Sequence, residues 1–542
     1  MSNCPKCNND ELFIHTYGNY GGYCIFHCDK NDVSTIRWNK STNEDVAKFW
    51  WALENSILIK SKNHTTYMTN IIFPTGEIVA TMHAFSKSKS KKFYFSDCHF
   101  VYDLTISNTS DSSFIFLRSH FDNAFSLLRS STIGVLSFKE TTFNGTVTIN
   151  EIDTKEVVMH MNIELSDCAF NESFFVKKSD IKTMSINNCS FNKIFKLELI
   201  NTSSLSIKNS SFKDEFTINN EPHEFERNTS YLVGLLWLEN IVFEKNFCIL
   251  GIQELHSMLL LRDIIVSEKA IAIIGNSECQ NLLIQNFQNL ASNLKIVNVL
   301  VKNSLKTDNV TFGKCEFNNF NLLNATSLQI ENTSFAESKF TNVRWGKINE
   351  DRFLHMDRQA ARQLKAINNA QGETVIGNQF YALEMRLHSK ELNWHEHFGE
   401  KLVQNIYGLI SNHSNDWVLA TIWFFAFGFL FAALAEPGSH AYALPLPLLF
   451  IIVGYWIYVA DKPTADNPIH LSLAILGPVV FLFCLFSCNF EFLVALINPL
   501  NFKDSKDLLR EANLVLVYIC RLIEIFIGYQ IIIAIRKNTK FT

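Results

Sequence analysis

The pattern of apolar and polar positions divides the chain into parts with different periodicities. Between residues 90 and 345, apolar and polar residues alternate in short stretches such as TMSINNCSF, SLSIKNSSF and SLQIENTSF. This period of two predicts strands. After Trp345 the apolar spacing becomes helical and predicts a helical neck over residues 346–412. Four long apolar runs follow, at 417–435, 442–460, 470–488 and 513–535, and each approaches the ~20 residues that cross a bilayer.

A short signature recurs through the middle segment: Asp or Asn, any two residues, and then Phe. It occupies residues 97–100, 167–170, 188–191, 209–212, 240–243, 309–312 and 332–335. Phe170, Phe191 and Phe212 are spaced 21 residues apart. A fixed period with one strand and one turn per repeat predicts a solenoid. We expect a right-handed parallel β-helix over residues 90–345, in which one Phe per coil stacks on the next and Asn side chains form a ladder at the corner.

The predicted solenoid lacks the pattern of a catalytic surface. β-helix enzymes such as polysaccharide lyases need Asp, Arg or Lys clustered on one exposed face, and no such cluster recurs in this segment. The sequence also contains no P-loop and no nucleophile elbow. We therefore expect a scaffold or a recognition surface rather than an enzyme.

Four cysteines near the N-terminus form two pairs, Cys4 with Cys7 and Cys24 with Cys28. Each pair can present two sulfur atoms to one tetrahedral ion. The pattern predicts a zinc ribbon over residues 1–60 that holds one structural zinc ion, with His27 as the alternative to Cys28 as fourth ligand. A thioredoxin-like redox pair is the other interpretation, but no βαβ pattern surrounds it. The stretch STNEDVAKFWWALENS predicts a helix that packs on the ribbon.

The neck and the segments after it carry a resemblance to a known group of proteins. Gly372 divides the neck into two helices, and EKLVQNIYGLISNHSNDW predicts a third helix that lies in the membrane interface. The segments RQLKAINNAQGETVIGNQFYALEMR, NIYGLISNHS, INPL and AIRKNTKF follow in this order. Over residues 300–542 the chain resembles bacterial pentapeptide-repeat proteins with a C-terminal membrane domain, part of which is likened to ion channels. The resemblance implies a location in the bacterial inner membrane.

The four apolar runs predict an α-helical, four-span membrane domain over residues 413–542. A cytosolic zinc ribbon and the basic residues near the C-terminus place both termini in the cytoplasm. The segment 489–512 is apolar but too short to cross, and it contains Glu491, Asn498 and Pro499. Such a segment is either a re-entrant loop that lines a pore or an interfacial helix that only anchors the chain.

Two opposite charges lie inside the last apolar run. Arg521 and Glu524 are three residues apart and therefore face the same side of a helix. A charge in a membrane helix is costly unless it has a partner or faces water. The two residues can pair with each other or across a helix interface, and they serve either as a clamp between helices or in conduction.

Charge and composition narrow the choice of partners. The formal net charge is -5 and the isoelectric point is about 6.4, so no overall basic field indicates nucleic acid as a partner. The N-terminus has no signal-peptide pattern, so we expect the solenoid in the cytosol.

The leading functional hypothesis joins these parts. We expect a solenoid that senses or binds a cytosolic protein or a phage-derived trigger, and a homo-oligomeric membrane part that acts as a channel or disrupts the bilayer. A sensor coupled to a membrane effector suits abortive anti-phage defence. The alternative is a membrane-tethered scaffold that binds a cytosolic partner and conducts nothing.

Overall fold

The computed structural model divides the chain into two compact units, Met1–Met356 and Asp357–Thr542. It describes residues 49, 51, 53, 65–73, 92–107, 110–128, 132–152, 161–221, 233–252, 258–290, 293–348, 352–353, 355–435 and 514–539. The predicted zinc ligands lie outside these residues, and so do the predicted spans 442–460 and 470–488 and the segment 489–512. Those predictions therefore remain predictions.

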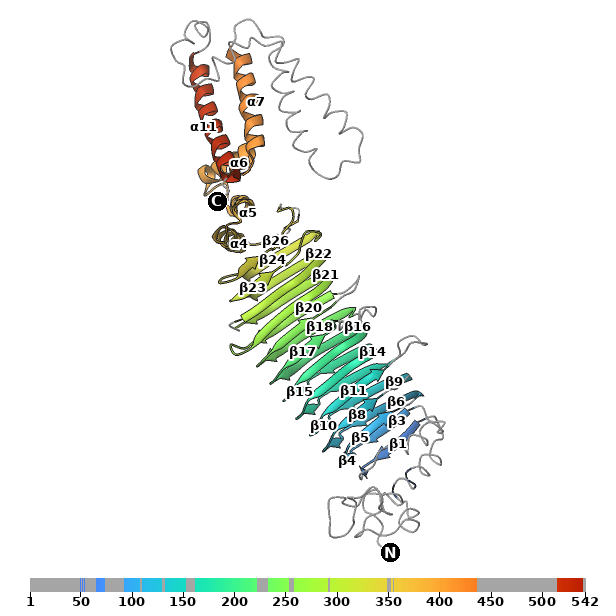
Figure 1. Ribbon diagram of the computed structural model, residues 1–542. Helices are drawn as coiled ribbons and strands as arrows, with labels where there is room; N and C mark the ends of the chain where they lie inside the picture. The colour runs from blue at the N-terminus through green and yellow to red at the C-terminus, as the bar shows by residue number, and fades with distance from the viewer. Residues whose placement is uncertain are drawn as a thin grey trace. The chain divides into compact units, whose positions relative to one another are not determined.

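The first unit is a parallel β-solenoid, as the repeat predicted (Figure 1). Its described strands form one sheet of 26 strands, and the paired strands run parallel. In chain order they are β1 (Thr65–Thr69), β2 (Ile72–Phe73), β3 (Lys92–Ser96), β4 (His99–Phe100), β5 (Leu104–Ser107), β6 (Ser110–Leu117), β7 (His120–Phe121), β8 (Phe125–Leu128), β9 (Thr132–Lys139), β10 (Thr142–Phe143), β11 (Val147–Ile152), β12 (Asn162–Ser166), β13 (Ala169–Phe170), β14 (Phe174–Asn187), β15 (Ser190–Phe191), β16 (Phe195–Phe212), β17 (Phe216–Asn219), β18 (Leu235–Phe243), β19 (Phe247–Leu250), β20 (Met258–Val266), β21 (Ile271–Asn289), β22 (Asn293–Thr311), β23 (Cys315–Asn318), β24 (Ser327–Ser334), β25 (Lys339–Thr341) and β26 (His355–Met356).

The solenoid extends beyond residues 90–345 at both ends. At the N-terminal end β1 pairs with β3 and β2 pairs with β4, and Asn70 and Phe73 carry one more copy of the signature. At the other end β26 pairs with β24. Of the helix predicted to pack on the ribbon, residues 49, 51 and 53 are described as helical, and the ring of Phe49 contacts Phe73 of the solenoid.

Phenylalanine rings form stacked columns in the core of the solenoid. Phe170 pairs in register with Phe191, and Phe191 with Phe212, so the three rings lie one above the other. Their centroids are 4.6 and 4.9 Å apart with interplanar angles of 2° in both pairs. A second column, in which Phe174 stacks on Phe195, crosses the first edge to face. The predicted stack of one Phe per coil is confirmed.

The Asn or Asp of the signature turns the chain at a corner of each coil. Asn188 and Asn209 have φ angles of 55° and 49°, in the left-handed region that Asn and Asp tolerate better than other side chains with a Cβ. The side-chain amides form the predicted ladder: Asn240 donates to Asn209 over 2.8 Å, and Asn309 donates to Asn286 over 2.9 Å. The signature therefore encodes both the turn and the contact between coils.

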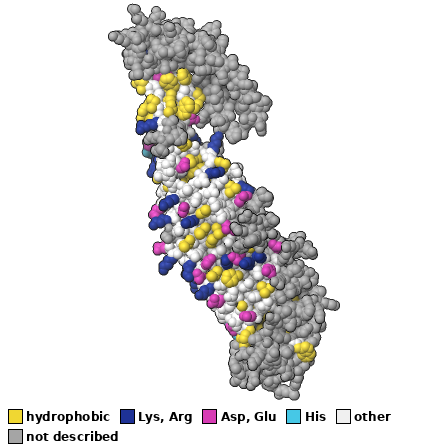
Figure 2. Space-filling model, in the orientation of Figure 1, with side chains coloured by type: hydrophobic (Ala, Val, Ile, Leu, Met, Phe, Trp, Pro, Cys, Tyr) yellow, Lys and Arg dark blue, Asp and Glu magenta, His cyan; other side chains and the backbone are white. Residues whose placement is uncertain are grey.

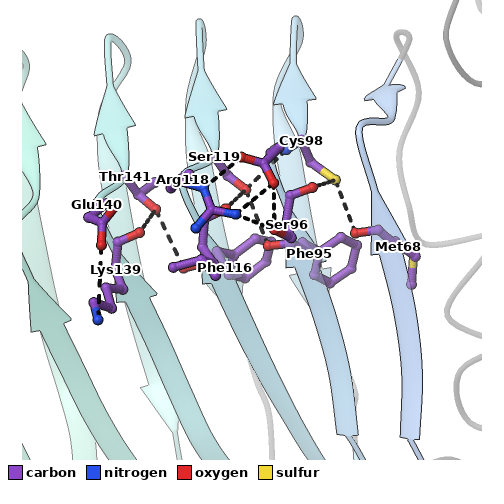
Figure 3. Close-up of polar contacts among 12 residues, drawn as sticks. Met68, Phe95, Ser96, Cys98, Phe116, Arg118, Ser119, Lys139, Glu140 and Thr141 are labelled. Atoms are coloured by element: carbon purple, nitrogen blue, oxygen red, sulfur yellow. Dashed lines mark hydrogen bonds and ion pairs between the residues drawn. The ribbon is translucent and has the colours of Figure 1, made fainter. Parts of the chain in front are cut away.

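Arg118 occupies this corner in one coil and replaces the ladder with an ion pair (Figure 3). Its guanidinium donates two hydrogen bonds to the carboxylate of Asp97, over 2.7 and 2.9 Å. Hydrogen bonds from Arg118 and Ser96 hold the pKa of Asp97 below its usual value. In the same close-up, the buried thiol of Cys98 lies 3.5 Å from the carbonyl oxygen of Met68, and burial raises the pKa of Cys98 to about 12. Cys98 is therefore a small, unreactive core residue.

One buried arginine holds the C-terminal end of the solenoid together. The guanidinium of Arg352 donates to the carbonyl oxygens of Leu322, Ala325, Trp345 and Lys347. The acceptors come from the last coils and from the loop that follows them. A single side chain thus satisfies four carbonyl groups of the irregular backbone at this end of the solenoid.

The second unit consists, in its described part, of the helices α4 (Arg358–Ala370), α5 (Thr374–Glu391), α6 (Phe398–Ser411), α7 (Trp417–Ala435) and α11 (Leu514–Thr539). The side chain of Asp357 caps α4 by accepting from Ala360 over 2.6 Å. Gly372, with a φ of 84°, separates α4 from α5, as predicted. The helices α7 and α11 coincide with the predicted runs 417–435 and 513–535.

Among the described residues, one helical stretch is long and apolar enough to cross a membrane. It is Val517–Lys537 in α11, with a mean hydropathy of 1.8 over its most apolar part. This conclusion rests on length and composition alone.

Candidate functional site in the helical unit

The distribution of side chains around α11 differs from that in a soluble helix. Most of its exposed positions are apolar or aromatic: Leu522 and Ile532 are 69% and 65% exposed. Its buried positions include Arg521, Glu524 and Gln530, with long polar side chains, beside apolar ones such as Ile527. A helix in water buries its apolar face and exposes its polar face, whereas this helix buries three polar side chains and leaves large apolar ones outside. Hydrophobic side chains gather on the described part of the helical unit in Figure 2.

The connection between α6 and α7 positions two hydroxyl groups against α11. Asn412, His413 and Ser414 all have positive φ angles, between 47° and 59°, and make a tight turn. This turn directs the Ser414 hydroxyl to Gln530, whose Oε1 accepts its hydrogen bond over 2.6 Å, with Ser411 a second, longer donor at 3.4 Å. Both serines are buried, and the amide nitrogen of Gln530 has no hydrogen-bond partner. The polar cluster therefore joins segments more than a hundred residues apart.

Glu524 is the unusual member of this face. It is 1% exposed, and neither carboxylate oxygen receives a hydrogen bond, from Arg521 or from any other residue in the described part of the chain. The direct pair with Arg521 that the spacing allowed is thus not formed as a hydrogen bond. A buried carboxylate with no donor is costly, because it has lost its water without a replacement.

A second buried glutamate in the same unit, Glu384, has a structural role and serves as a comparison. Glu384 on α5 is 2% exposed on its side chain and accepts from Lys365 over 2.7 Å and from Arg362 over 2.9 Å, both on α4. Burial alone would raise its pKa, but these two cations lower the pKa of Glu384 below the usual value. Glu384 is therefore a satisfied clamp between two helices, and Glu524 is not.

A carboxylate of this kind has a limited set of uses inside a membrane helix. It can take up a proton, contact a cation in a water-filled path, or pair with a donor on a second copy of the chain. Sequence reasoning found Arg521 and Glu524 because they interrupt an apolar run. It missed Gln530, which interrupts the same run, and also Ser411 and Ser414, whose approach to α11 no local pattern reveals.

Comparisons of the chain with models of protein families, with curated proteins and with solved structures find no match.

Proposed function

We propose that the chain is a bacterial inner-membrane protein in which a cytosolic, right-handed β-solenoid binds a trigger and a multi-pass helical domain acts on the membrane. The observation that carries the proposal is the arrangement of side chains on α11, whose exposed face is largely apolar while Arg521, Glu524 and Gln530 are buried. A lipid environment makes this arrangement favourable, because the outer face then meets hydrocarbon and the polar groups meet one another.

Helix α6 supports a membrane location independently of α11. Five of its apolar side chains are exposed on one side: Phe398, Leu402, Val403, Ile406 and Leu409. Such a surface on a short helix next to a spanning segment fits the boundary between headgroups and acyl chains. The C-terminal end of α11 lies against α5, where Asn378 donates to the carbonyl of Lys537 over 3.2 Å. This contact favours a C-terminus on the same side of the membrane as the neck, which we take to be cytoplasmic.

The solenoid is suited to binding rather than to catalysis. Its strands are held by stacked rings and a backbone ladder, so its outer surface is rigid. Positive and negative side chains are interspersed on the face seen in Figure 2. Ion pairs such as Lys208 with Glu239, at 3.2 Å, join neighbouring strands of the solenoid. A protein partner of mixed charge fits such a surface better than nucleic acid does.

Glu524 favours an effector over a passive anchor. An anchor gains nothing from an unpaired buried carboxylate, whereas a conducting or proton-responsive assembly needs one. We therefore place Glu524 on the inner side of a homo-oligomeric, channel-like domain, to which the segment with Glu491, Asn498 and Pro499 would add a re-entrant loop. A zinc ribbon at the N-terminus and a role in abortive anti-phage defence complete the proposal.

Cation flux from liposomes that contain the full-length protein tests the proposal. We expect flux from the wild type, at least a ~10-fold loss in Glu524→Gln, and no change in Tyr529→Phe, which alters the exposed face of the same helix. Protein that inserts into the liposomes but releases no cations would favour the tethered scaffold instead. Protein that does not partition into membranes would remove both functions.

A further inference from the structure

A cluster of two histidines and one aspartate lies on the outer surface of the solenoid near its N-terminal end. His99 in β4 and His120 in β7 are register partners in neighbouring parallel strands. Each precedes a Phe that is buried in the core, so each imidazole faces outward because side chains alternate along a strand. Asp122 follows β7 directly and lies at the corner of the same coil.

The three side chains converge on one point. The Nε2 atom of His99 lies 2.7 Å from Oδ2 of Asp122, and the Nε2 atom of His120 lies 3.0 Å from Oδ1 of the same carboxylate. The three ligand atoms are all within 4.8 Å of one another. All three side chains are partly exposed, between 31% and 41%, so solvent and ions can reach them.

The solenoid backbone holds the cluster rigidly. Behind the histidines, Phe100 stacks on Phe121 with centroids 4.5 Å apart and an interplanar angle of 6°. The main-chain N–H of Asp122 donates to the carbonyl of Phe100 over 2.9 Å and fixes the corner. Because the backbone under these side chains is already fixed, they lose little conformational entropy when they bind an ion.

The cluster is a local feature rather than part of the repeat. The position of the histidines is occupied by Ile72 in the preceding coil and by Thr142 in the following one. In the following coil, the amide nitrogen of Asn144 lies 3.0 Å from Nε2 of His120. Asn144 donates no hydrogen bond to Asp122. The carboxylate is therefore directed at the two imidazoles and not into the asparagine ladder.

We propose that His99, His120 and Asp122 bind a divalent transition-metal ion, with zinc as the first choice. Imidazole nitrogen and carboxylate oxygen are the ligands that such ions take from proteins, and three ligands leave at least one position for water or for a donor atom of a partner. Asn144 lies where it can hydrogen-bond to a metal-bound water. This site differs in kind from the predicted ribbon site, whose ligands are thiolates.

The test compares zinc content in full-length variants. After dialysis of detergent-solubilised protein against buffered free zinc, the double variant His99→Gln, His120→Gln should hold one zinc ion fewer per chain than the wild type. The comparison is independent of how much zinc the ribbon holds. His355→Gln is the matched control, because it removes an exposed solenoid histidine 3.7 Å from Glu331, outside the cluster.

A second measurement identifies the ligands. Loss of an outer-shell partner alone weakens metal binding by about 10–100-fold, so Asp122→Asn, which removes a direct ligand, should weaken zinc binding at least ~10-fold. The same proteins can be loaded with cobalt in place of zinc. The difference between the wild-type and variant absorption spectra should then be that of cobalt with nitrogen and oxygen ligands, without the charge-transfer band of thiolates. Equal zinc content in the wild type and in a double variant with an unchanged circular-dichroism spectrum would overturn the proposal. If the double variant does not fold, the folded Asp122→Asn variant is compared with the wild type instead, and equal zinc content in these two proteins would overturn the proposal.

Discussion

At the scale of single residues, two side chains make the solenoid. Phenylalanine fills most coils and stacks where neighbouring coils both carry it, which combines burial of a large apolar surface with favourable ring geometry. Asparagine turns the corner with a positive φ and donates its amide to the preceding coil. Neither role depends on the identity of the outward-facing residues, which explains why the repeat tolerates so much variation elsewhere.

Truncation of Phe191 should clearly lower the free energy of unfolding of the solenoid. Phe191 is 1% exposed and its ring lies between those of Phe170 and Phe212, with Phe195 against its edge. We expect Phe191→Ala to lower the free energy of unfolding by about 3–5 kcal/mol, because it leaves a cavity in the stack. Denaturant unfolding followed by circular dichroism measures the change.

The control for this prediction is Lys208→Ala. Lys208 faces outward, with its ammonium 3.6 Å from the centroid of the Trp237 ring and 3.2 Å from Glu239. These exposed contacts are worth about 1 kcal/mol or less. Equal losses in the two variants would contradict the assignment of the Phe column as the core.

At the scale of elements, α11 carries one buried polar side chain whose oxygen accepts hydrogen bonds and another whose oxygens accept none from the described residues. Gln530 accepts hydrogen bonds from Ser411 and Ser414, whereas Glu524, two turns earlier, receives none from the described residues. The first residue stabilises the packing of α11 on the α6–α7 connection. The buried carboxylate of Glu524 lowers the stability of the helical unit, and we propose that it serves the function of the protein.

Substitutions at these two positions should therefore change stability in opposite directions. Gln530→Leu removes the acceptor of the buried Ser414 hydroxyl and should lower the free energy of unfolding by about 1–3 kcal/mol. Glu524→Met, of similar size, removes a buried carboxylate that has no donor and should leave stability equal or higher. Thermal unfolding in detergent micelles compares them with Ile532→Leu, on the exposed face. A Glu524→Met variant less stable than Ile532→Leu would show that the carboxylate has a stabilising partner.

At the scale of the whole molecule, the chain separates into a solenoid and a helical unit at Met356. Every described strand lies in the first unit, and Arg352 closes the end of the solenoid by binding residues of that unit. The described core of the solenoid is therefore formed within the first unit. The described helices of the second unit expose large apolar side chains, the surface that we propose contacts lipid.

A piece comprising residues 1–356 should consequently fold without the helical unit. We expect it to stay in solution without detergent, to give a circular-dichroism spectrum dominated by β-structure, and to unfold cooperatively. The full chain should require detergent under the same conditions. A mainly helical spectrum, or a requirement of the shorter piece for detergent, would contradict the division of the chain.

Features that repeat, or that depend on local chemistry, could be predicted from the sequence. The period of 21 residues between Phe170, Phe191 and Phe212 predicted the stack, and the Asn of the signature predicted the corner ladder, because a fixed period places equivalent residues of successive coils against one another. Gly372 predicted the break between two helices. The copy of the repeat at Asn70 was missed because it lies apart from the other copies, in a segment without clear alternation.

The polar groups that meet in space could be identified only from the folded chain. His99 and His120 lie one period apart, but Arg118 and not Asp or Asn begins the second copy, so the sequence pattern did not align them. Ser411 and Ser414 meet Gln530 through a turn and a helix packing that join distant parts of the chain. The unpaired state of Glu524 likewise depends on what surrounds it in space. A repeat specifies its own contacts through its period, whereas a single contact between unlike segments depends on how the chain packs.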